Sequence, residues 1–310
     1  MSALNPRSDL HDKPLYALVL RAGAMLMLAC MFASVKYLSE NGVHLVESLF
    51  FRQLGALPVV LLFLMRGPGL KGIYTRHFNK HLSRSALGIC GMVCFFTSYI
   101  MLPLAEATTI GFATPIFATI LSALFLKEDV GMHRWTAVLA GFAGVLVITQ
   151  YGAAPDTEFN ILGVSIALLA ALIASVISLM LRDLGRTEAP TTILFWFSAL
   201  TLVPLAILLP FFIQPHSPRI WAGLAIMGLV GGFGQWLLTS ALRWGPVSLV
   251  ISMDYTSLIW STLLGWLIWS TLPGAYTWIG AALICSSGIY ISWREHLRLK
   301  EIRSARTLID

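Results

Sequence analysis

Charge is scarce in this 310-residue chain: only 12% of its residues are Asp, Glu, Lys or Arg, whereas 57% are hydrophobic. Soluble domains carry about 25% charged residues. A soluble core of this length cannot hide so much apolar surface, so we expect the solvent of this chain to be lipid. The net charge of +6 then reflects basic loops gathered on one side of a membrane, and no nucleic-acid partner is expected.

Sequence signatures of catalysis and metal binding are also missing. The four cysteines, Cys30, Cys90, Cys94 and Cys285, lie inside apolar runs without a zinc-site spacing, so we expect small buried thiols rather than disulfides or metal ligands. The seven histidines lie at the ends of apolar runs or in loops, with neither a His-Glu-x-x-His nor a Gly-x-x-x-x-Gly-Lys-Ser/Thr motif. The sequence therefore predicts no enzyme, no ATPase, no metal and no cofactor.

What the chain does contain is a duplication, in which segments of the first half return in the second half at an offset of 140. Leu87-Gly88-Ile89-Cys90-Gly91 corresponds to Met227-Gly228-Leu229-Val230-Gly231, Phe95-Phe96 corresponds to Gln235-Trp236, and Thr114-Pro115 corresponds to Asp254-Tyr255. We expect one structural unit written twice.

Apolar runs long enough to span a membrane, about 20 residues each, occur ten times. We predict spans at 15–38, 45–65, 84–101, 106–126, 133–150, 160–181, 190–212, 219–241, 246–269 and 274–293. They form two five-helix repeats, at 15–150 and 160–293, followed by a charged cytoplasmic tail at 294–310 that extends the last helix into water.

The distribution of Lys and Arg predicts the orientation. With the N-terminus in the cytoplasm, 18 of the 21 basic residues fall on the inner side, so both termini are expected there. Because each repeat has an odd number of spans, the two copies must cross the membrane in opposite directions. The predicted fold is an all-α polytopic membrane protein with ten transmembrane helices, arranged as two inverted repeats around a central cavity.

Asp254 is the sharpest candidate for a binding residue. It lies about eight residues into the ninth span, roughly 12 Å deep at 1.5 Å per residue, where a carboxylate should be paired, protonated or facing water. It could bind a substrate amine, carry a coupling proton, or make only a structural hydrogen bond. Gln235 and Tyr255 are expected to give polar contacts nearby, and Trp236 an apolar wall.

The first repeat supplies further candidates at helical spacing. Phe95 and Tyr99 share one face of the third span with two glycines, and Thr114 precedes Pro115, which should bend the fourth span. Close helix packing is the favoured explanation for the glycines alone. Arg52 is a candidate anion ligand, although a mutually neutralising cluster with Lys36 and Glu47 is the favoured explanation.

Several of these segments resemble a known family. Pro103-Leu104-Ala105-Glu106-Ala107-Thr108-Thr109, Pro115-Ile116-Phe117-Ala118-Thr119, Phe50-Phe51-Arg52 and Asp254-Tyr255-Thr256-Ser257 are similar to EamA-type members of the bacterial drug/metabolite transporter superfamily. The resemblance implies a basket of helices whose cavity is built from spans 1, 3, 4, 6, 8 and 9. One departure is Thr271, which stands where the second repeat normally carries an acid matching Glu128.

The sequence thus predicts a secondary transporter in the bacterial inner membrane. Its expected partners are the lipid bilayer and a small polar or zwitterionic metabolite, such as an amino acid or a derivative. Proton coupling, a homodimer, and either import or export stay open. The alternatives are a vitamin or nucleoside-like substrate of the riboflavin or S-adenosylmethionine type and, from another class, a membrane enzyme or lipid-handling protein.

Overall fold

The computed structural model describes residues 14–66, 69–125, 132–151, 160–185, 187–241, 244, 250 and 253–307. Within these ranges the chain is helical and has no strand. This agrees with an apolar chain in lipid, where a helix satisfies its backbone hydrogen bonds without water.

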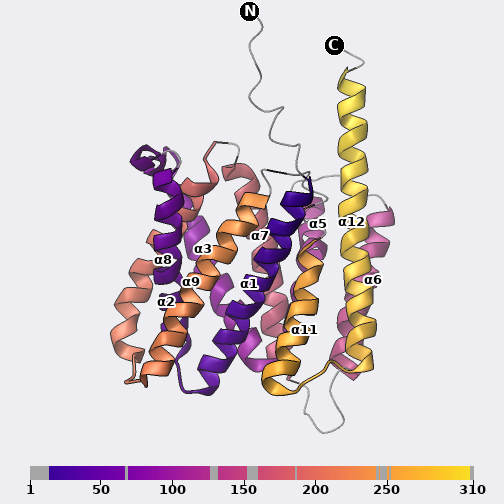
Figure 1. The fold of residues 1–310 in the computed structure, drawn as a ribbon. Coiled ribbons are helices and arrows are strands. Elements are labelled where there is room, and N and C mark those ends of the chain that lie inside the picture. Colours follow the sequence, from indigo (N-terminus) through magenta and orange to yellow (C-terminus); the bar gives the residue numbers. More distant parts are fainter. Residues whose placement is uncertain are drawn as a thin grey trace, which may run out of the picture.

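The described helices make ten passes between the two ends of a bundle (Figure 1). Eight passes are continuous: α1 (Pro14–Glu40), α2 (Leu45–Arg66), α3 (Phe78–Met101), α6 (Met132–Tyr151), α7 (Ile161–Leu184), α8 (Pro190–Phe212), α9 (Pro218–Ala241) and α12 (Ala275–Thr307). Two are broken: α4 (Leu104–Gly111) with α5 (Thr114–Phe125), and η3 (Met253–Tyr255) with α11 (Thr256–Trp269). The short helix η2 (Gly69–Ile73) lies between α2 and α3.

Length and composition support a membrane-spanning bundle. Seven spans of the described residues, one of them the combined α4–α5 pass, are long and apolar enough to cross a bilayer. α6 and α12 contain shorter apolar stretches, Trp135–Ile148 and Ala275–Ile291. The predicted all-α polytopic membrane fold is confirmed.

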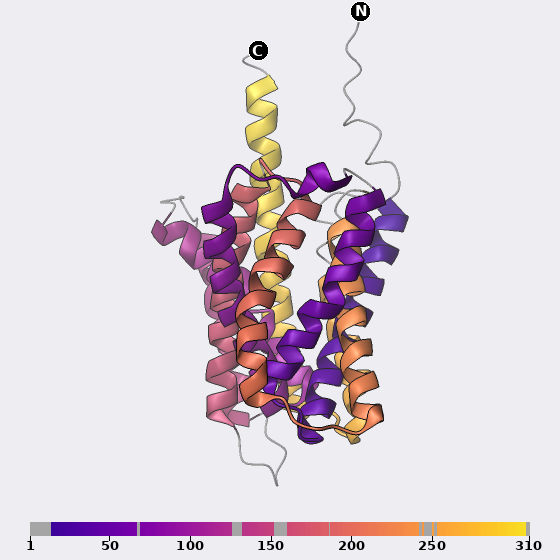
Figure 2. The ribbon, with the colours of Figure 1, turned by 90° about the vertical axis from the view of Figure 1, so that its left-hand side faces the viewer.

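The two halves run in opposite directions. α1 begins at the end of the bundle where α12 finishes, whereas α7 begins at the other end (Figures 1 and 2). Helix packing follows the same rule: α1 packs on α9 as α7 packs on α3, and α2 packs on α9 as α8 packs on α3. Each contact becomes its counterpart when the first five passes are exchanged with the last five, which is the pattern of an inverted repeat. α6 and α12 pack on each other at one side of the bundle (Figure 1).

Some boundaries differ from those expected. α3 begins at Phe78 rather than residue 84, and α12 continues to Thr307, so the charged tail does extend the last helix. In the ninth pass, residues 246–249 and 251–252 lie outside the described residues, as does Glu128.

The four cysteines are free, as expected, but they are not buried. Cys90 is exposed and the other three are partly exposed. The expectation of buried thiols is wrong because the outer surface of a membrane bundle is itself apolar, so an apolar residue has no need to face inward.

Candidate substrate cavity

A cavity of about 310 Å³ lies between α1, α3, the α4–α5 pass and the η3–α11 pass. Its lining is mostly apolar with a few polar groups, which is typical of small-molecule sites. The lining residues are Met25, Leu28, Ala29, Phe32, Phe95, Tyr99, Leu104, Thr108, Gly111, Phe112, Thr114, Pro115, Asp254, Tyr255, Ser257 and Ser261. Five predicted site residues are among them: Phe95, Tyr99, Thr114, Asp254 and Tyr255. Among the described residues, the lining comes from passes 1, 3, 4 and 9, whereas passes 6 and 8, which the family resemblance implied, contribute none.

Aromatic rings form the walls of the cavity. Phe32 and Tyr99 are stacked with ring centroids 4.0 Å apart and planes 10° apart. Phe112 and Tyr255 meet at 5.0 Å. The Tyr99 hydroxyl lies 3.1 Å from the Thr108 hydroxyl, which itself donates to the Leu104 carbonyl at 2.7 Å. The rings therefore come from four different passes, and the Tyr99 and Thr108 hydroxyls are hydrogen-bonded within the wall.

The two broken passes place polar groups beside these rings. Pro115 has no N–H to give to the carbonyl of Gly111, four residues earlier. The Thr114 hydroxyl donates to that carbonyl instead, at 2.8 Å, and the helix breaks at Phe112 and Ala113. The predicted bend is thus confirmed, and the Thr114 side chain has a structural reason for being polar.

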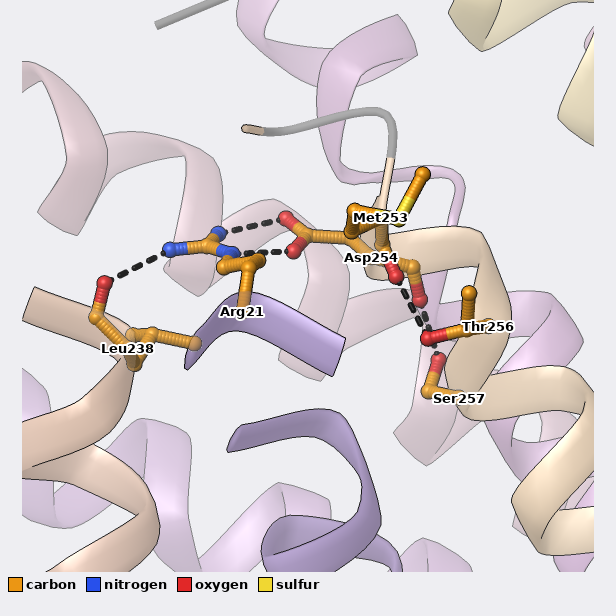
Figure 3. Close-up of polar contacts among 6 residues, drawn as sticks. All are labelled: Arg21, Leu238, Met253, Asp254, Thr256 and Ser257. Carbon is orange, nitrogen blue, oxygen red and sulfur yellow. Dashed lines mark hydrogen bonds and ion pairs between the residues drawn. The ribbon is translucent and has the colours of Figure 1, made fainter. Parts of the chain in front are cut away.

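The corresponding break in the second half lies at η3. The Ser257 hydroxyl donates to the Asp254 carbonyl at 2.6 Å, and the Thr256 hydroxyl donates to the Met253 carbonyl at 2.7 Å (Figure 3). Thr114 and Asp254, which correspond at the offset of 140, therefore both lie at a helix break that lines the cavity.

Asp254 forms a two-point ion pair with Arg21 of α1 (Figure 3). Arg21 Nε donates to Oδ1 at 2.5 Å and Nη2 donates to Oδ2 at 2.6 Å. Arg21 Nη1 also donates to the Leu238 carbonyl of α9 at 3.0 Å. The Arg21 side chain is 7% exposed and that of Asp254 is 29% exposed. One guanidinium thus joins α1, α9 and η3, and the Asp254 carboxylate is neutralised while still reaching the cavity.

Asp254 is therefore paired, which is one of the states expected for a carboxylate at this depth, but its partner was not identified from the sequence. Arg21 is 233 residues away from Asp254, and in the sequence it counts only as one of the 18 basic residues expected on the inner side. The available signal was a cation within an apolar run, which should have raised the question of a counter-ion.

The structure places Gln235 and Trp236 outside the cavity lining. The Trp236 ring stacks on Phe63 of α2, with ring centroids 3.7 Å apart. The backbone carbonyl of Gln235 accepts from Thr239 at 2.9 Å. α9 turns its glycine face to α2, and this rotation about the helix axis carries both residues away from the cavity.

Arg52 also lies outside the lining, and the cluster predicted for it does not form. Glu47 pairs with His216 at 2.8 Å, whereas Lys36 Nζ donates to the Leu102 carbonyl at 2.7 Å. Arg52 donates instead to the side chain of its neighbour Gln53. The three charged groups have separate partners because they project in different directions from α1 and α2.

Within the described ranges, no three His, Cys, Asp or Glu side chains gather in a way that could hold a metal ion. The fold and the cavity define a multi-pass membrane protein with an inverted repeat and an aromatic-walled site for a small molecule.

The comparisons with known proteins make this assignment specific. The model of the EamA-like transporter family matches residues 15–150 and again residues 161–293, and the chain belongs to that family. It is 28% identical to a riboflavin transporter of Vibrio cholerae, over 91% of this chain and 93% of that protein. It is also 28% identical to the pseudopaline exporter CntI of Pseudomonas aeruginosa, over 88% of this chain and 97% of that protein. A crystal structure with 21% identity superposes with a TM-score of 0.61, covering 89% of this chain and 95% of that one, and shows the shared fold alone.

Proposed function

We propose that this chain is a secondary transporter for a small metabolite that carries a flat aromatic ring system. The observation that carries the proposal is the cavity wall, to which Phe32, Phe95, Tyr99, Phe112 and Tyr255 all contribute rings. Flat rings stack favourably on such surfaces. The neutralised state of Asp254 supports the same class, because a paired carboxylate attracts an amine less than a free one does. The riboflavin transporter among the relatives agrees with this choice.

Alternating access is the mechanism that the contacts of α1 support. Its cavity residues, Met25 to Phe32, lie between two points of attachment. Arg21 holds one end to η3 and α9. At the other end Lys36 donates to the Leu102 carbonyl, and Trp269 Nε1 donates to Glu40 at 2.6 Å. Releasing one attachment while keeping the other would open the cavity to one side of the membrane at a time.

The distribution of Lys and Arg supports one orientation of the chain in the membrane. We place both termini in the cytoplasm of a bacterial cell, at the inner membrane, because 18 of 21 basic residues then lie inside. A reporter that is active only in the cytoplasm, fused after residue 310, should be active, and an inactive C-terminal fusion would reverse the orientation.

The test of the substrate class is a binding experiment with a matched pair of variants. Riboflavin and other flat-ring metabolites should raise the thermal unfolding midpoint of the purified protein in a saturable way. Phe32→Leu should weaken the apparent affinity by about two- to twelvefold, since one aromatic contact contributes ~0.5–1.5 kcal/mol. Phe211→Leu, which removes a ring 78% exposed on the outside of α8, should leave the affinity unchanged. Stabilisation by amino acids but by no flat-ring compound would overturn the proposed class, and stabilisation by lipids alone would favour a lipid-handling protein.

A zwitterionic metabolite is the second candidate, and the Arg21–Asp254 pair is the observation that favours it. A substrate amine could replace Arg21 at the exposed side of Asp254, while its carboxylate takes Arg21. Transport in vesicles separates the roles of Asp254. Full transport by Asp254→Asn would exclude a proton carried by this carboxylate, and full transport by Asp254→Leu would exclude any direct role.

A further inference from the structure

Outside the cavity, α2, α3 and α8 meet at a junction that buries two arginines. Arg52 of α2 and Arg84 of α3 are each 7% exposed. The central carbon of Arg84 lies 3.7 Å from the centroid of the Phe197 ring of α8, and that of Arg52 lies 6.0 Å from it. Both guanidinium groups therefore lie near the same aromatic ring, within about 10 Å of each other. At this separation two like charges repel each other in a protein interior.

These two cations are not neutralised by the described part of the chain, where neither forms a salt bridge. Arg52 donates only to Gln53 and, at 3.8 Å, to the Met92 sulfur. Arg52 Nε, Arg84 Nε and Arg84 Nη1 have no hydrogen-bond partner among the described residues. Buried charges in membrane proteins are paired or hydrogen-bonded. We therefore expect a negatively charged hydrogen-bond acceptor at this junction.

α3 adds two more polar groups close to Arg84. His81, fully buried, lies one turn before Arg84, and Ser85, 2% exposed, follows Arg84 directly. The nitrogens of His81 and the hydroxyl of Ser85 also have no partner in the described ranges. A side chain at Gly88, one turn further on, would collide with the Phe197 ring at 2.5 Å. Gly88 thus makes room for the ring, and the ring in turn holds the guanidinium of Arg84.

From this arrangement we infer that the α2–α3–α8 junction is a binding site for a small oxyanion, a phosphate or a carboxylate group. Arginine offers only donors, in a planar fork that matches the oxygens of these groups. Hydrogen bonds between a guanidinium and an anionic oxygen are among the strongest in proteins. The oxyanion could be free in solution or belong to a lipid headgroup. The site is separate from the substrate cavity, and the inference is independent of the proposed substrate.

The experiment is a thermal-unfolding titration of the full chain in a maltoside detergent, whose headgroup contains no phosphate or carboxylate. Inorganic phosphate or acetate should raise the unfolding midpoint in a saturable way beyond sodium chloride of equal ionic strength. Arg84→Gln and Arg52→Gln should each weaken the apparent affinity at least tenfold. Lys80→Gln is the matched control: it removes a basic residue from the same helix, one whose exposed ammonium pairs with Asp183 at 2.6 Å, and it should keep the wild-type affinity.

A second arm identifies the source of the oxyanion. If phosphatidylglycerol nanodiscs stabilise the wild type, but not Arg84→Gln, and soluble phosphate then adds nothing, the ligand is a lipid headgroup. Arg84→Lys keeps the charge but loses the planar fork of donors, so it should bind the oxyanion with intermediate affinity. It replaces the glutamine variants in the test if those do not fold. The inference is overturned if neither soluble oxyanions nor anionic lipid stabilise the wild type beyond chloride, which would mean that water alone satisfies the arginines. Equal loss in Lys80→Gln would overturn it too.

Discussion

Two helix junctions that correspond to each other in the inverted repeat are packed with opposite chemistry. At the α2–α9 junction, a side chain at Gly228 would overlap the backbone carbonyl of Phe51, and one at Gly55 would overlap the backbone of Gly228. At the α8–α3 junction, the corresponding pair of helices is separated by the Phe197 ring and the guanidinium of Arg84. The α2–α9 junction brings backbone against backbone, and we call it the dry junction; the α8–α3 junction holds a ring and a guanidinium between its helices, and we call it the polar junction.

The residue that corresponds to Arg84 shows how far the copies have diverged. At the offset of 140 it is Leu224, fully buried in a cluster with Met31, Val35 and Leu38. Gly88 corresponds to Gly228, and both glycines remain, although one admits a ring and the other admits a backbone. The duplication therefore keeps the positions at which helices approach, and leaves the side chains around them free to take on separate tasks.

Placing an arginine at the dry junction should have the largest effect on stability. Leu224→Arg would place an unpaired cation among apolar side chains, at a cost of about 3 kcal/mol or more. We expect the folded protein to be lost on size-exclusion chromatography, or its unfolding midpoint to fall steeply. Leu224→Met, which conserves volume, should cost less than about 1.5 kcal/mol. A stable Leu224→Arg protein would mean that the dry junction can hydrate.

Adding one methyl group at the corresponding glycines should have an intermediate effect that differs between the junctions. Gly228→Ala pushes against backbone atoms that cannot move aside, so we expect a loss near the upper end of the ~1–3 kcal/mol range for overpacking. Gly88→Ala meets a side-chain ring that can swing, so its loss should lie at the lower end. Chemical unfolding in detergent would measure both variants, and equal losses would contradict the distinction drawn between the two junctions.

Removing the Arg84 cation from the polar junction should have the smallest effect on the free energy of unfolding. Unlike the two changes above, it should not destabilise the protein. Arg84→Leu gives this position the residue of its counterpart and removes an unpaired buried cation. In a buffer that contains chloride and no oxyanion, we expect the free energy of unfolding to stay unchanged or rise by about 1 kcal/mol. Added phosphate should reverse the order of wild type and variant. A variant that is less stable in both buffers would show that packing against Phe197 outweighs the charge.

The fold could be predicted well because it depends on patterns that can be read along the sequence. Apolar run length gave the ten passes, and an odd number of passes in each repeat made the inversion unavoidable. Five residues of the cavity lining were identifiable for the same reason. Phe95 and Tyr99 share a helix face, Thr114 and Asp254 occupy corresponding positions at helix breaks, and Tyr255 follows Asp254.

What the sequence could not provide was the rotation of each helix about its axis and its long-range partners. Trp236 and Gln235 were misplaced because the glycine face of α9 turns toward α2. Arg52 was grouped with the charges nearest in sequence, whereas the residue that shares its environment is Arg84, on the next helix. Arg21 and Asp254 are joined only by the folded chain.

The bond between Arg21 and Asp254 also has a consequence for biogenesis. Arg21 is in the first pass and Asp254 in the ninth, 233 residues later. At about 5–20 residues per second of synthesis, α1 enters the bilayer tens of seconds before its counter-ion leaves the ribosome. During that interval the arginine, near one end of its helix, can extend its long side chain toward the lipid headgroups. Closure of the bundle around α1 is therefore among the last events of assembly, completed only after most of the chain has already been inserted.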